Sequence, residues 1–388
     1  MPEPAVTAAF SPTAIDDLRR DERFMRAALA LGRRGLGNTW PNPAVGCLIV
    51  RREGGQDIVV GRGWTQPGGR PHAETQALAE AGERARGATA YVTLEPCSHY
   101  GRTGPCADAL ARAGVKRVVG ALRDPDPRVG GRGFDMLGRY GLDVTEGVLA
   151  DEAYQAHVGH ITRIVFGRPA VTVKIAVSAD GKVAGPGGAP VRITGPEADS
   201  RVHLMRAQSD AIAVGIGTAL ADDPRLTVRL PGLQGCSPIR IVFDSHLRLP
   251  PTSGLVRSAR EVPVWVVARS DAPVAPEKAL VEAGVEVMRV GGGAVSGSAR
   301  RTLDLGEALR LLGTRGMTRL LVEAGPQLSA SLIEADLVEE FVQFSSPEPM
   351  GAGLAALTPE LLATLDGQLP NMAVKMVGHD IMTIQRRS

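Results

Sequence analysis

The stretch Thr93-Leu-Glu-Pro-Cys-Ser-His-Tyr-Gly-Arg-Thr-Gly-Pro-Cys106 decides the fold of the first half of the chain. Together with His72, it supplies the side chains of a metal centre. One histidine and two thiolates, those of Cys97 and Cys106, can fill three positions of a tetrahedral zinc ion and leave the fourth open for a water molecule. Zinc lowers the pKa of such a water to about 7, so it becomes a nucleophile. The stretch therefore predicts a catalytic zinc centre in an α/β domain.

Glu74, two residues after His72, is not needed for coordination and can carry protons between the water and a leaving group. The His-x-Glu and Pro-Cys pattern is typical of enzymes that remove an amine from a nucleobase by hydrolysis. In that pattern two residues separate the cysteines, whereas eight separate Cys97 from Cys106, so the loop between them must fold back. The alternative is a structural zinc site with Cys47 or His99 as fourth ligand. Glu74 would then have no function.

The bulk composition excludes several classes of protein. A chain of 388 residues is too long for a typical single domain and predicts two. Since 44 Lys and Arg balance 42 Asp and Glu, we expect no nucleic-acid partner. Only four cysteines occur, which fits a reducing compartment, the cytoplasm. No apolar run approaches the roughly 18 residues that span a bilayer, so we expect no membrane association.

Short apolar runs alternate with helical segments along both halves of the chain, which predicts an α/β layer fold in each. Val45–Val50 and Ala90–Thr93 are expected strands of the first half, with a helix over Ala73–Ala85 between them. In the second half, Ala170–Val177 is an expected strand that only Lys174 interrupts. The expected organisation is a disordered segment at 1–20, a zinc domain at 21–150, a linker at 151–167 and a second domain at 168–388.

The second half carries weaker signals of anion binding. Gly325 lies between an expected strand and an expected helix, where backbone N–H groups can face a dinucleotide phosphate. Gly215-Ile-Gly-Thr218 is a similar turn, although such turns are also common as plain connections. Arg206 and Arg229 could grip a phosphate monoester, but exposed surface arginines are the alternative. In the first half, the loop Asp124–Gly133 is either a plain connector or the rim of the zinc pocket.

The whole chain resembles a known family, the bifunctional deaminase/reductases of riboflavin biosynthesis. In these enzymes a cytidine-deaminase-like zinc domain precedes a reductase of dihydrofolate-reductase-like fold. The long spacing between the two cysteines is normal in that family. The motifs that carry the resemblance are Pro41-Asn-Pro-Ala-Val-Gly46, Pro71-His-Ala-Glu74, Thr93–Thr103, Asp124-Pro-Asp-Pro127, Leu220-Ala-Asp-Asp-Pro224 with Leu226-Thr-Val-Arg229, and Val322-Glu-Ala-Gly-Pro326.

The resemblance implies two consecutive reactions on one phosphorylated pyrimidine. Zinc-dependent deamination converts 2,5-diamino-6-(5-phosphoribosylamino)pyrimidin-4-one to 5-amino-6-(5-phosphoribosylamino)uracil. The second domain then uses NADPH to reduce the ribosyl chain to ribityl. The resemblance also implies association into a homo-oligomer. The rival is a deaminase whose second half is only a scaffold or an oligomerisation module.

The family's functional residues can be carried over position by position. The zinc ligands are His72, Cys97 and Cys106, and the catalytic residue is Glu74. The expected substrate contacts are Asn42, Pro190, Arg206, Leu226, Arg229 and Glu323. The expected NADP(H) contacts are Val177, Arg192, Thr218, Asp222, Ser245, Gly325, Pro326, Gln327, Leu328, Ser329, Ala330 and Ser331.

Several positions depart from the family pattern. Arg192 stands where Trp is common in the family, and Pro190 stands where Ser is common. In the first pocket, Thr65 replaces a common His and Arg70 a common acidic residue. Ser346–Gly351 replaces a strand end that usually contains Lys, and no role is carried over there.

Overall fold

The computed structural model describes residues 12–100, 104–127, 129–294 and 301–387, which form two compact units. The first unit consists of the chain up to Gly35 and Asn42–Ile161. The second consists of Leu36–Pro41 and the chain from Thr162 onward. No helix within the described ranges is both long and apolar enough to cross a membrane.

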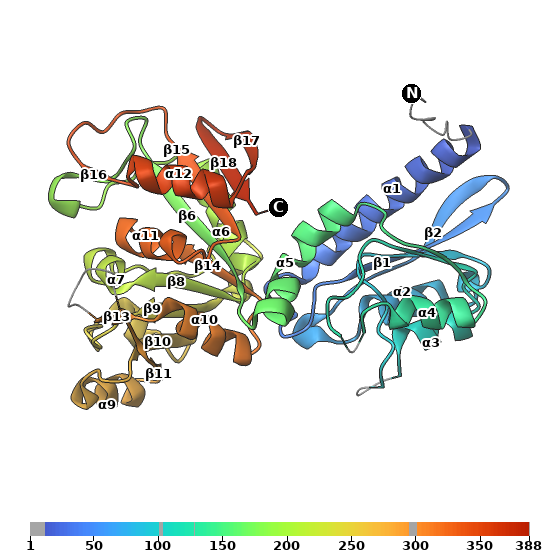
Figure 1. Cartoon of the computed structure of the whole chain (residues 1–388), viewed down its shortest axis with the longest axis horizontal. Helices are drawn as coiled ribbons and strands as arrows, with labels where there is room; N and C mark the ends of the chain where they lie inside the picture. The colour runs from blue at the N-terminus through green and yellow to red at the C-terminus, as the bar shows by residue number, and fades with distance from the viewer. Residues whose placement is uncertain (1–11, 101–103, 128, 295–300, 388) are drawn as a thin grey trace, which may run out of the picture. The chain divides into compact units, whose positions relative to one another are not determined.

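The first unit is a five-stranded sheet covered by helices on both faces (Figure 1). The strand order is β2-β1-β3-β4-β5. Strand β1 pairs antiparallel with both β2 and β3, whereas β3, β4 and β5 are parallel to one another. The strands are β1 (Gly46–Glu53), β2 (Gln56–Trp64), β3 (Thr89–Val92), β4 (Arg117–Gly120) and β5 (Asp143–Thr145). The helices are α1 (Pro12–Gly32), α2 (Ala73–Ala81), α3 (Cys106–Arg112), α4 (Arg132–Arg139) and α5 (Ala150–Phe166).

Alternation along the strands explains the layers, because successive side chains of a strand point to opposite faces. Cys47 and Ile49 of β1 pack in one core with the apolar residues of α2, α3 and α4. Leu48 and Val50 pack in the other core with α1 and α5. Helix α2 lies close to β2 because β2 carries glycine: a Cβ on Gly63 would sit 2.0 Å from the carbonyl oxygen of Ala73. This close packing fixes the start of α2, where His72 and Glu74 lie.

One expected boundary is corrected. Helix α1 begins at Pro12, so residues 12–20 of the expected disordered segment are helical, while residues 1–11 lie outside the described part. Arg20 donates to Asp57 of β2 at 2.8 Å, and this tertiary contact stabilises the extra turns. The expected linker at 151–167 is helical, because α5 spans most of it, and the boundary between the two units falls within this helix, after Ile161.

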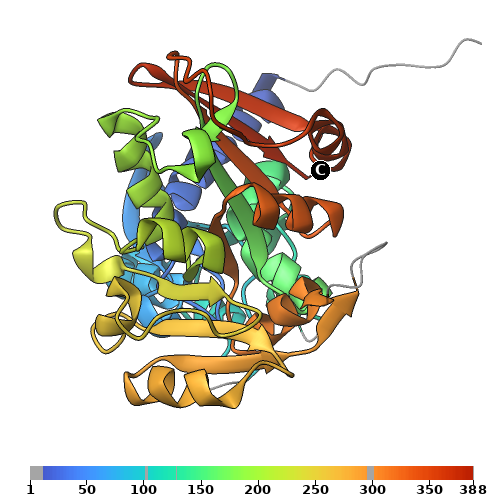
Figure 2. The same ribbon diagram turned by 90° about the vertical axis from the view of Figure 1, so that its left-hand side faces the viewer.

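The second unit is built on a nine-stranded sheet of order β11-β10-β9-β8-β14-β6-β15-β18-β17 (Figures 1 and 2). Neighbouring strands from β11 to β15 are parallel, and β18 and β17 are antiparallel. The sheet strands are β6 (Ala170–Val177), β8 (Ala211–Gly215), β9 (Ile239–Phe243), β10 (Val264–Arg269), β11 (Glu286–Val290), β14 (Arg319–Glu323), β15 (Glu340–Ser345), β17 (Asn371–Val377) and β18 (Asp380–Arg386). Two small ladders pair β7 (Lys182–Ala184) with β16 (Leu354–Ala355) and β12 (Gly292–Ala294) with β13 (Arg301–Leu303).

Helices cover both faces of this sheet, as expected for a mostly parallel sheet whose strands are buried on both sides. One apolar core contains residues of α10 (Leu305–Thr314), α11 (Pro326–Glu334) and α12 (Pro359–Gln368). The cores on the other face contain residues of α6 (Pro196–Ala207), α7 (Ile216–Asp222), α8 (Gly254–Arg257) and α9 (Val274–Glu282). The strands expected from the apolar runs of the second half are confirmed.

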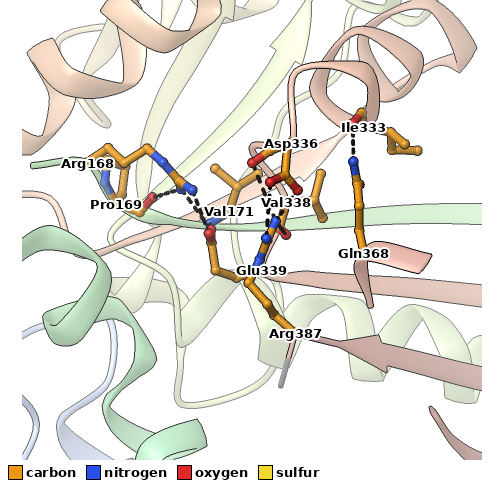
Figure 3. A network of polar contacts seen from close by, with 9 residues as sticks. All are labelled: Arg168, Pro169, Val171, Ile333, Asp336, Val338, Glu339, Gln368 and Arg387. Carbon is orange, nitrogen blue, oxygen red and sulfur yellow. Dashed lines mark hydrogen bonds and ion pairs between the residues drawn. The ribbon is translucent and has the colours of Figure 1, made fainter. Parts of the chain in front are cut away.

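A buried ion pair connects β6 to the turn before β15 (Figure 3). Arg168 donates to both carboxylate oxygens of Glu339, at 2.7 and 2.9 Å, and the N–H of Val171 donates to the same carboxylate at 2.8 Å. The side chains of Arg168 and Glu339 are only 11% and 5% exposed. Nearby, Arg387 donates to Asp336 at 2.6 Å and so attaches the end of the chain.

We expect Glu339→Ala to lower the free energy of unfolding of the second unit by about 3–5 kcal/mol, because it leaves the buried charge of Arg168 uncompensated. Urea unfolding of the full chain measures the effect. Glu348→Ala is the matched control, since Glu348 is exposed and an exposed position changes stability by only about 0.5 kcal/mol. Equal unfolding midpoints for the two variants would contradict the expected importance of this pair.

Candidate active sites

The first site lies where α2 and α3 begin. His72 is the N-cap residue of α2, and Glu74 lies in the first turn of that helix. Cys97 lies in the loop after β3, and Cys106 is the first residue of α3, directly after Pro105. The backbone therefore brings two helix amino ends and one loop to the same place. Helix amino ends favour the anionic form of a thiol.

The three expected ligands have the spacing that zinc requires. Nδ1 of His72 lies 3.3 Å from Sγ of Cys106 and 3.7 Å from Sγ of Cys97, and all three ligand atoms lie within 4.8 Å of one another. With Zn–N near 2.1 Å and Zn–S near 2.3 Å, tetrahedral geometry separates nitrogen from sulfur by about 3.6 Å. The donor set therefore fits zinc. In the described part of the chain, neither Cys47 nor His99 joins this group of ligand atoms.

The thiols of Cys97 and Cys106 shift each other's pKa in opposite directions. A hydrogen bond from the Cys106 thiol is the main cause that lowers the pKa of Cys97 to about 4, and His72 acts in the same direction. The same interaction, with burial, raises the pKa of Cys106 well above its ordinary value. The backbone N–H of Cys106 also donates to Sγ of Cys97 at 3.3 Å. Since zinc binds thiolates, metal binding must release the proton of Cys106.

Glu74 is buried, with 3% of its surface exposed, beside this cluster. Burial raises its pKa to about 7, and the negative charge of Cys97 acts in the same direction. A carboxyl group with a pKa near the working pH can both accept and deliver a proton. The position and the pKa of Glu74 therefore suit its expected role as the proton carrier.

The side chains of Asn42 and Thr65 both form hydrogen bonds with the backbone of the first unit. Asn42 donates to the carbonyl of Gly69 at 3.2 Å, so its side chain lies against the turn that precedes His72. Thr65, a departure from the family pattern, is buried, and its hydroxyl accepts from the N–H of Val45 at 3.0 Å. Thr65 therefore stabilises the backbone beside Asn42. The sequence did not predict this structural role.

The second site contains a buried ion pair at the carboxyl ends of α6 and β14. Arg206 donates to both oxygens of Glu323, at 2.6 and 2.9 Å. Burial alone would raise the pKa of Glu323, but the hydrogen bonds and the charge of Arg206 outweigh it and lower that pKa. The structure thus brings these two expected substrate contacts together.

The segment 225–229 runs beside this pair. Arg206 also donates to the carbonyl of Thr227 at 3.0 Å, and the N–H of Arg229 donates to Nδ1 of His203 at 3.4 Å. Leu226 is only 2% exposed and packs in the core, so any substrate contact there falls to its backbone, which has a positive φ of 54°. Arg240 also stabilises this segment, because its side chain donates a hydrogen bond to the carbonyl of Arg225 at 3.3 Å.

Lys174 is a residue of this site that the sequence interpretation did not identify as functional. It pairs in register with Glu323 on the neighbouring parallel strand, and burial lowers its pKa. Its Nζ lies 5.9 Å from the ring centre of Phe344. The signal was present in the sequence, because Lys174 is the only charged residue in the apolar run of β6.

The expected cofactor residues gather at the carboxyl edge of the parallel sheet, where ligands of open α/β sheets bind. Gly325 is the N-cap of α11, and a Cβ added to it would lie 3.6 Å from Oγ1 of Thr218 in α7. The two glycine turns therefore lie side by side. Ser329 of α11 is fully buried, and its Oγ has no hydrogen-bond partner among the described residues. Backbone N–H groups at this helix end suit the phosphates of a dinucleotide.

The other expected cofactor residues and the expected substrate contact Pro190 divide into two groups. Val177 and Ser245 follow the same edge, at the ends of β6 and β9, and Asp222 ends α7, where burial raises its pKa. Pro190 and Arg192 lie on an exposed loop, and Arg192 pairs there with Asp199 at 2.7 Å. The expected contacts of Pro190 and Arg192 with substrate and cofactor stay predictions.

Comparisons with known proteins assign both halves of the chain. Residues 169–382 match the family described as the RibD C-terminal domain, and residues 18–122 match the cytidine and deoxycytidylate deaminase zinc-binding region. The riboflavin biosynthesis protein RibD of Escherichia coli is 40% identical over 93% of this chain and 98% of its own length. The chain belongs to the RibD family. Its Aquifex aeolicus relative is 38% identical over 86% of this chain and 89% of its own length.

Solved RibD structures share the fold along almost the entire chain. Acinetobacter baumannii RibD has a TM-score of 0.80 at 34% identity and covers 96% of this chain and 99% of its own. A deaminase/reductase from Thermotoga maritima has a TM-score of 0.79 at 30% identity, with coverages of 96% and 100%. The cytidine-deaminase-like and dihydrofolate-reductase-like domains expected from the sequence are confirmed, and with them zinc and NADP(H) as the cofactors of this RibD protein.

Proposed function

We propose that the chain catalyses two consecutive steps on one phosphorylated pyrimidine. The first is hydrolytic deamination of 2,5-diamino-6-(5-phosphoribosylamino)pyrimidin-4-one. The second is NADPH-dependent reduction of the ribosyl chain of 5-amino-6-(5-phosphoribosylamino)uracil to ribityl. The observation that carries the proposal is the group of His72, Cys97 and Cys106 beside the buried Glu74, in a chain that also has a reductase domain.

In the first step His72, Cys97 and Cys106 hold the metal, and zinc, when bound, supplies the Lewis acidity that activates water near neutral pH. Glu74 accepts a proton from the water while the oxygen of that water forms a bond to the ring carbon that carries the amine. The carbon–nitrogen bond then breaks, and Glu74 delivers the proton to the departing ammonia. Asn42, fixed against Gly69, is placed to orient the pyrimidine.

In the second step the substrate takes up a hydride and a proton, and NADPH, when bound, supplies the hydride. Arg206 and Arg229 present guanidinium groups that suit the substrate phosphate. Glu323, oriented by Arg206, accepts hydrogen bonds from the sugar hydroxyls. Lys174, beside Glu323, has a pKa lowered by burial and can hold or release a proton there.

One experiment tests both steps. Purified protein is incubated with the diaminopyrimidine phosphate, with and without NADPH, and the products are identified by mass. We expect the deaminated compound without NADPH and the ribityl product with it. Deamination without any reduction would support the rival, a deaminase with a scaffold domain. The proposal includes association into a homo-oligomer and a reducing compartment, which would keep the thiols of Cys97 and Cys106 free.

Metal analysis gives a separate test of the first site. We expect one zinc ion per chain of the parent protein, and little or none in Cys97→Ser, because removing one of three ligands weakens a site whose binding energy depends on all of them. Cys236→Ser is the matched control, since Cys236 is a free cysteine of the second unit. A parent protein without zinc, or a Cys97→Ser variant that keeps it, would contradict the site.

A further inference from the structure

Glu95 is a buried carboxylate that the zinc chemistry described above does not use. It lies two residues before Cys97 and is 4% exposed. Three backbone N–H groups donate to it: those of Asp124 at 3.1 Å and Gly131 at 2.9 Å to Oε2, and that of Gly133 at 2.7 Å to Oε1. Asp124 and Gly131 lie at the two ends of the loop between β4 and α4, and Gly133 lies in the first turn of α4. A single side chain therefore holds both ends of that loop.

The contact also caps α4. Gly131 is the N-cap residue of this helix, with φ of 82°, and has no side chain to bind the free N–H groups of the first turn. Glu95 takes the place of a local cap and puts a negative charge at the helix amino end, where it is stabilising. The fit is close, because a Cβ on Gly133 would lie 2.0 Å from the carbonyl oxygen of Pro96. The loop thus packs directly on the residue that precedes Cys97.

A second contact holds the same loop from the other side. Oδ1 of Asp124 accepts from the N–H of Asp126 at 2.9 Å and lies 3.2 Å from Nε2 of His160 in α5. This contact fixes only the start of the loop. The far end, at Gly131 and Gly133, is held by Glu95.

The start of α4 and the segment after Cys97 form two walls of one pocket with a volume of about 530 Å³. Ser98 and His99 line one wall, directly after the zinc ligand. The first turns of α4, starting with Arg132, line the other wall. Glu95 is bonded to α4 and precedes Ser98 by three residues, so it fixes the distance between the walls.

We propose that Glu95 is a positioning residue of the deaminase site, which holds the loop Asp124–Gly133 and the start of α4 against the segment that carries Cys97. This inference rests on the proposed deaminase function. It gives the loop a role in fixing the segment that carries Cys97, whereas the sequence left it either a plain connector or the rim of the zinc pocket. Glu95 itself contacts neither the substrate nor the metal.

Glu95→Gln tests the proposal with little change in size. A carboxylate has only acceptors, whereas the amide of glutamine replaces one oxygen with a donor group that must face a backbone N–H. Since a buried donor without a partner costs about 1–3 kcal/mol, we expect the KM for the diaminopyrimidine phosphate to rise about 5- to 150-fold. The kcat per bound zinc and the rate of NADPH oxidation with the deaminated substrate should stay near those of the parent.

Glu146→Gln is the matched control. Glu146 is a partly exposed glutamate whose carboxylate pairs with the side chain of Arg123, at 2.6 Å, and accepts no amide of the loop. Its KM should not change. An unchanged KM in Glu95→Gln, or a loss confined to zinc content and thermal stability, would overturn the positioning role. A parent protein that releases no ammonia would instead refute the proposed function.

Native-state hydrogen exchange on the unaltered protein keeps the proposal testable if Glu95→Gln does not fold. The N–H groups of Gly131 and Gly133 lie in a short helix start and would exchange rapidly if they faced water. Bound to a buried carboxylate, they should exchange at least about tenfold more slowly than unprotected amides in the same sequence context. Exchange of both amides at unprotected rates would overturn the proposal.

Discussion

Replacing Glu74 by Gln should reduce deamination by about 100- to 10,000-fold, the range typical of lost general acid and base catalysis. The amide keeps the size of the side chain but cannot accept the proton of the attacking water. Zinc should remain bound, since the three ligand atoms at His72, Cys97 and Cys106 are unchanged. Ammonia release and metal content, measured on the same preparation, check both statements.

Glu80→Gln is the matched control for this variant. Glu80 lies on the same helix, α2, but is exposed and pairs with Arg62 at 2.5 Å. Its loss should leave deamination within about twofold of the parent, since exposed substitutions have small effects. If Glu74→Gln released ammonia at the rate of the control, Glu74 would not be the proton carrier.

Arg229→Ala should raise the KM of the reduction about 10- to 150-fold, which corresponds to the loss of one hydrogen-bonded ion contact of about 1.5–3 kcal/mol. Partial burial, together with the neighbouring charges of Arg206 and Arg225, lowers the pKa of Arg229. Cations held this close repel one another, so an anion placed among them is attracted to all of them. A substrate phosphate would serve as that anion.

Arg225→Ala separates a specific contact from general positive charge. Arg225 is an exposed residue of the same segment, and only its backbone carbonyl is held, by Arg240. We expect a change in KM of less than about threefold, because screened charges at the surface contribute little. Equal effects of the two substitutions in steady-state assays would show that Arg229 makes no specific contact.

Much of the zinc centre could be predicted from the sequence because its ligands are local. His72 and Glu74 share one helix start, and Cys106 follows a proline that opens another, so the motifs themselves determine the backbone around them. The strands of the second half were also predictable, since parallel strands that are buried on both faces are continuous apolar runs. The exposed positions Pro190 and Arg192 gave no such local signal.

What the sequence did not predict depends on contacts between distant segments. Glu95 lies within the motif Thr93–Cys106, yet its hydrogen-bond partners at Gly131 and Gly133 can be identified only from the three-dimensional structure. The segment Leu36–Pro41 belongs to the second unit although its neighbours in sequence belong to the first, and no local pattern encodes such a crossing.

Two separate active sites in one chain predict separable losses, which ammonia release and NADPH oxidation, measured independently on Glu74→Gln and Arg229→Ala, would reveal. Glu74→Gln, given the already deaminated substrate, should oxidise NADPH at near-parental rate while failing to release ammonia from the diaminopyrimidine. Arg229→Ala should release ammonia normally and reduce poorly. If each substitution abolished both activities in folded, zinc-containing protein, the assignment of the two reactions to two sites would be wrong.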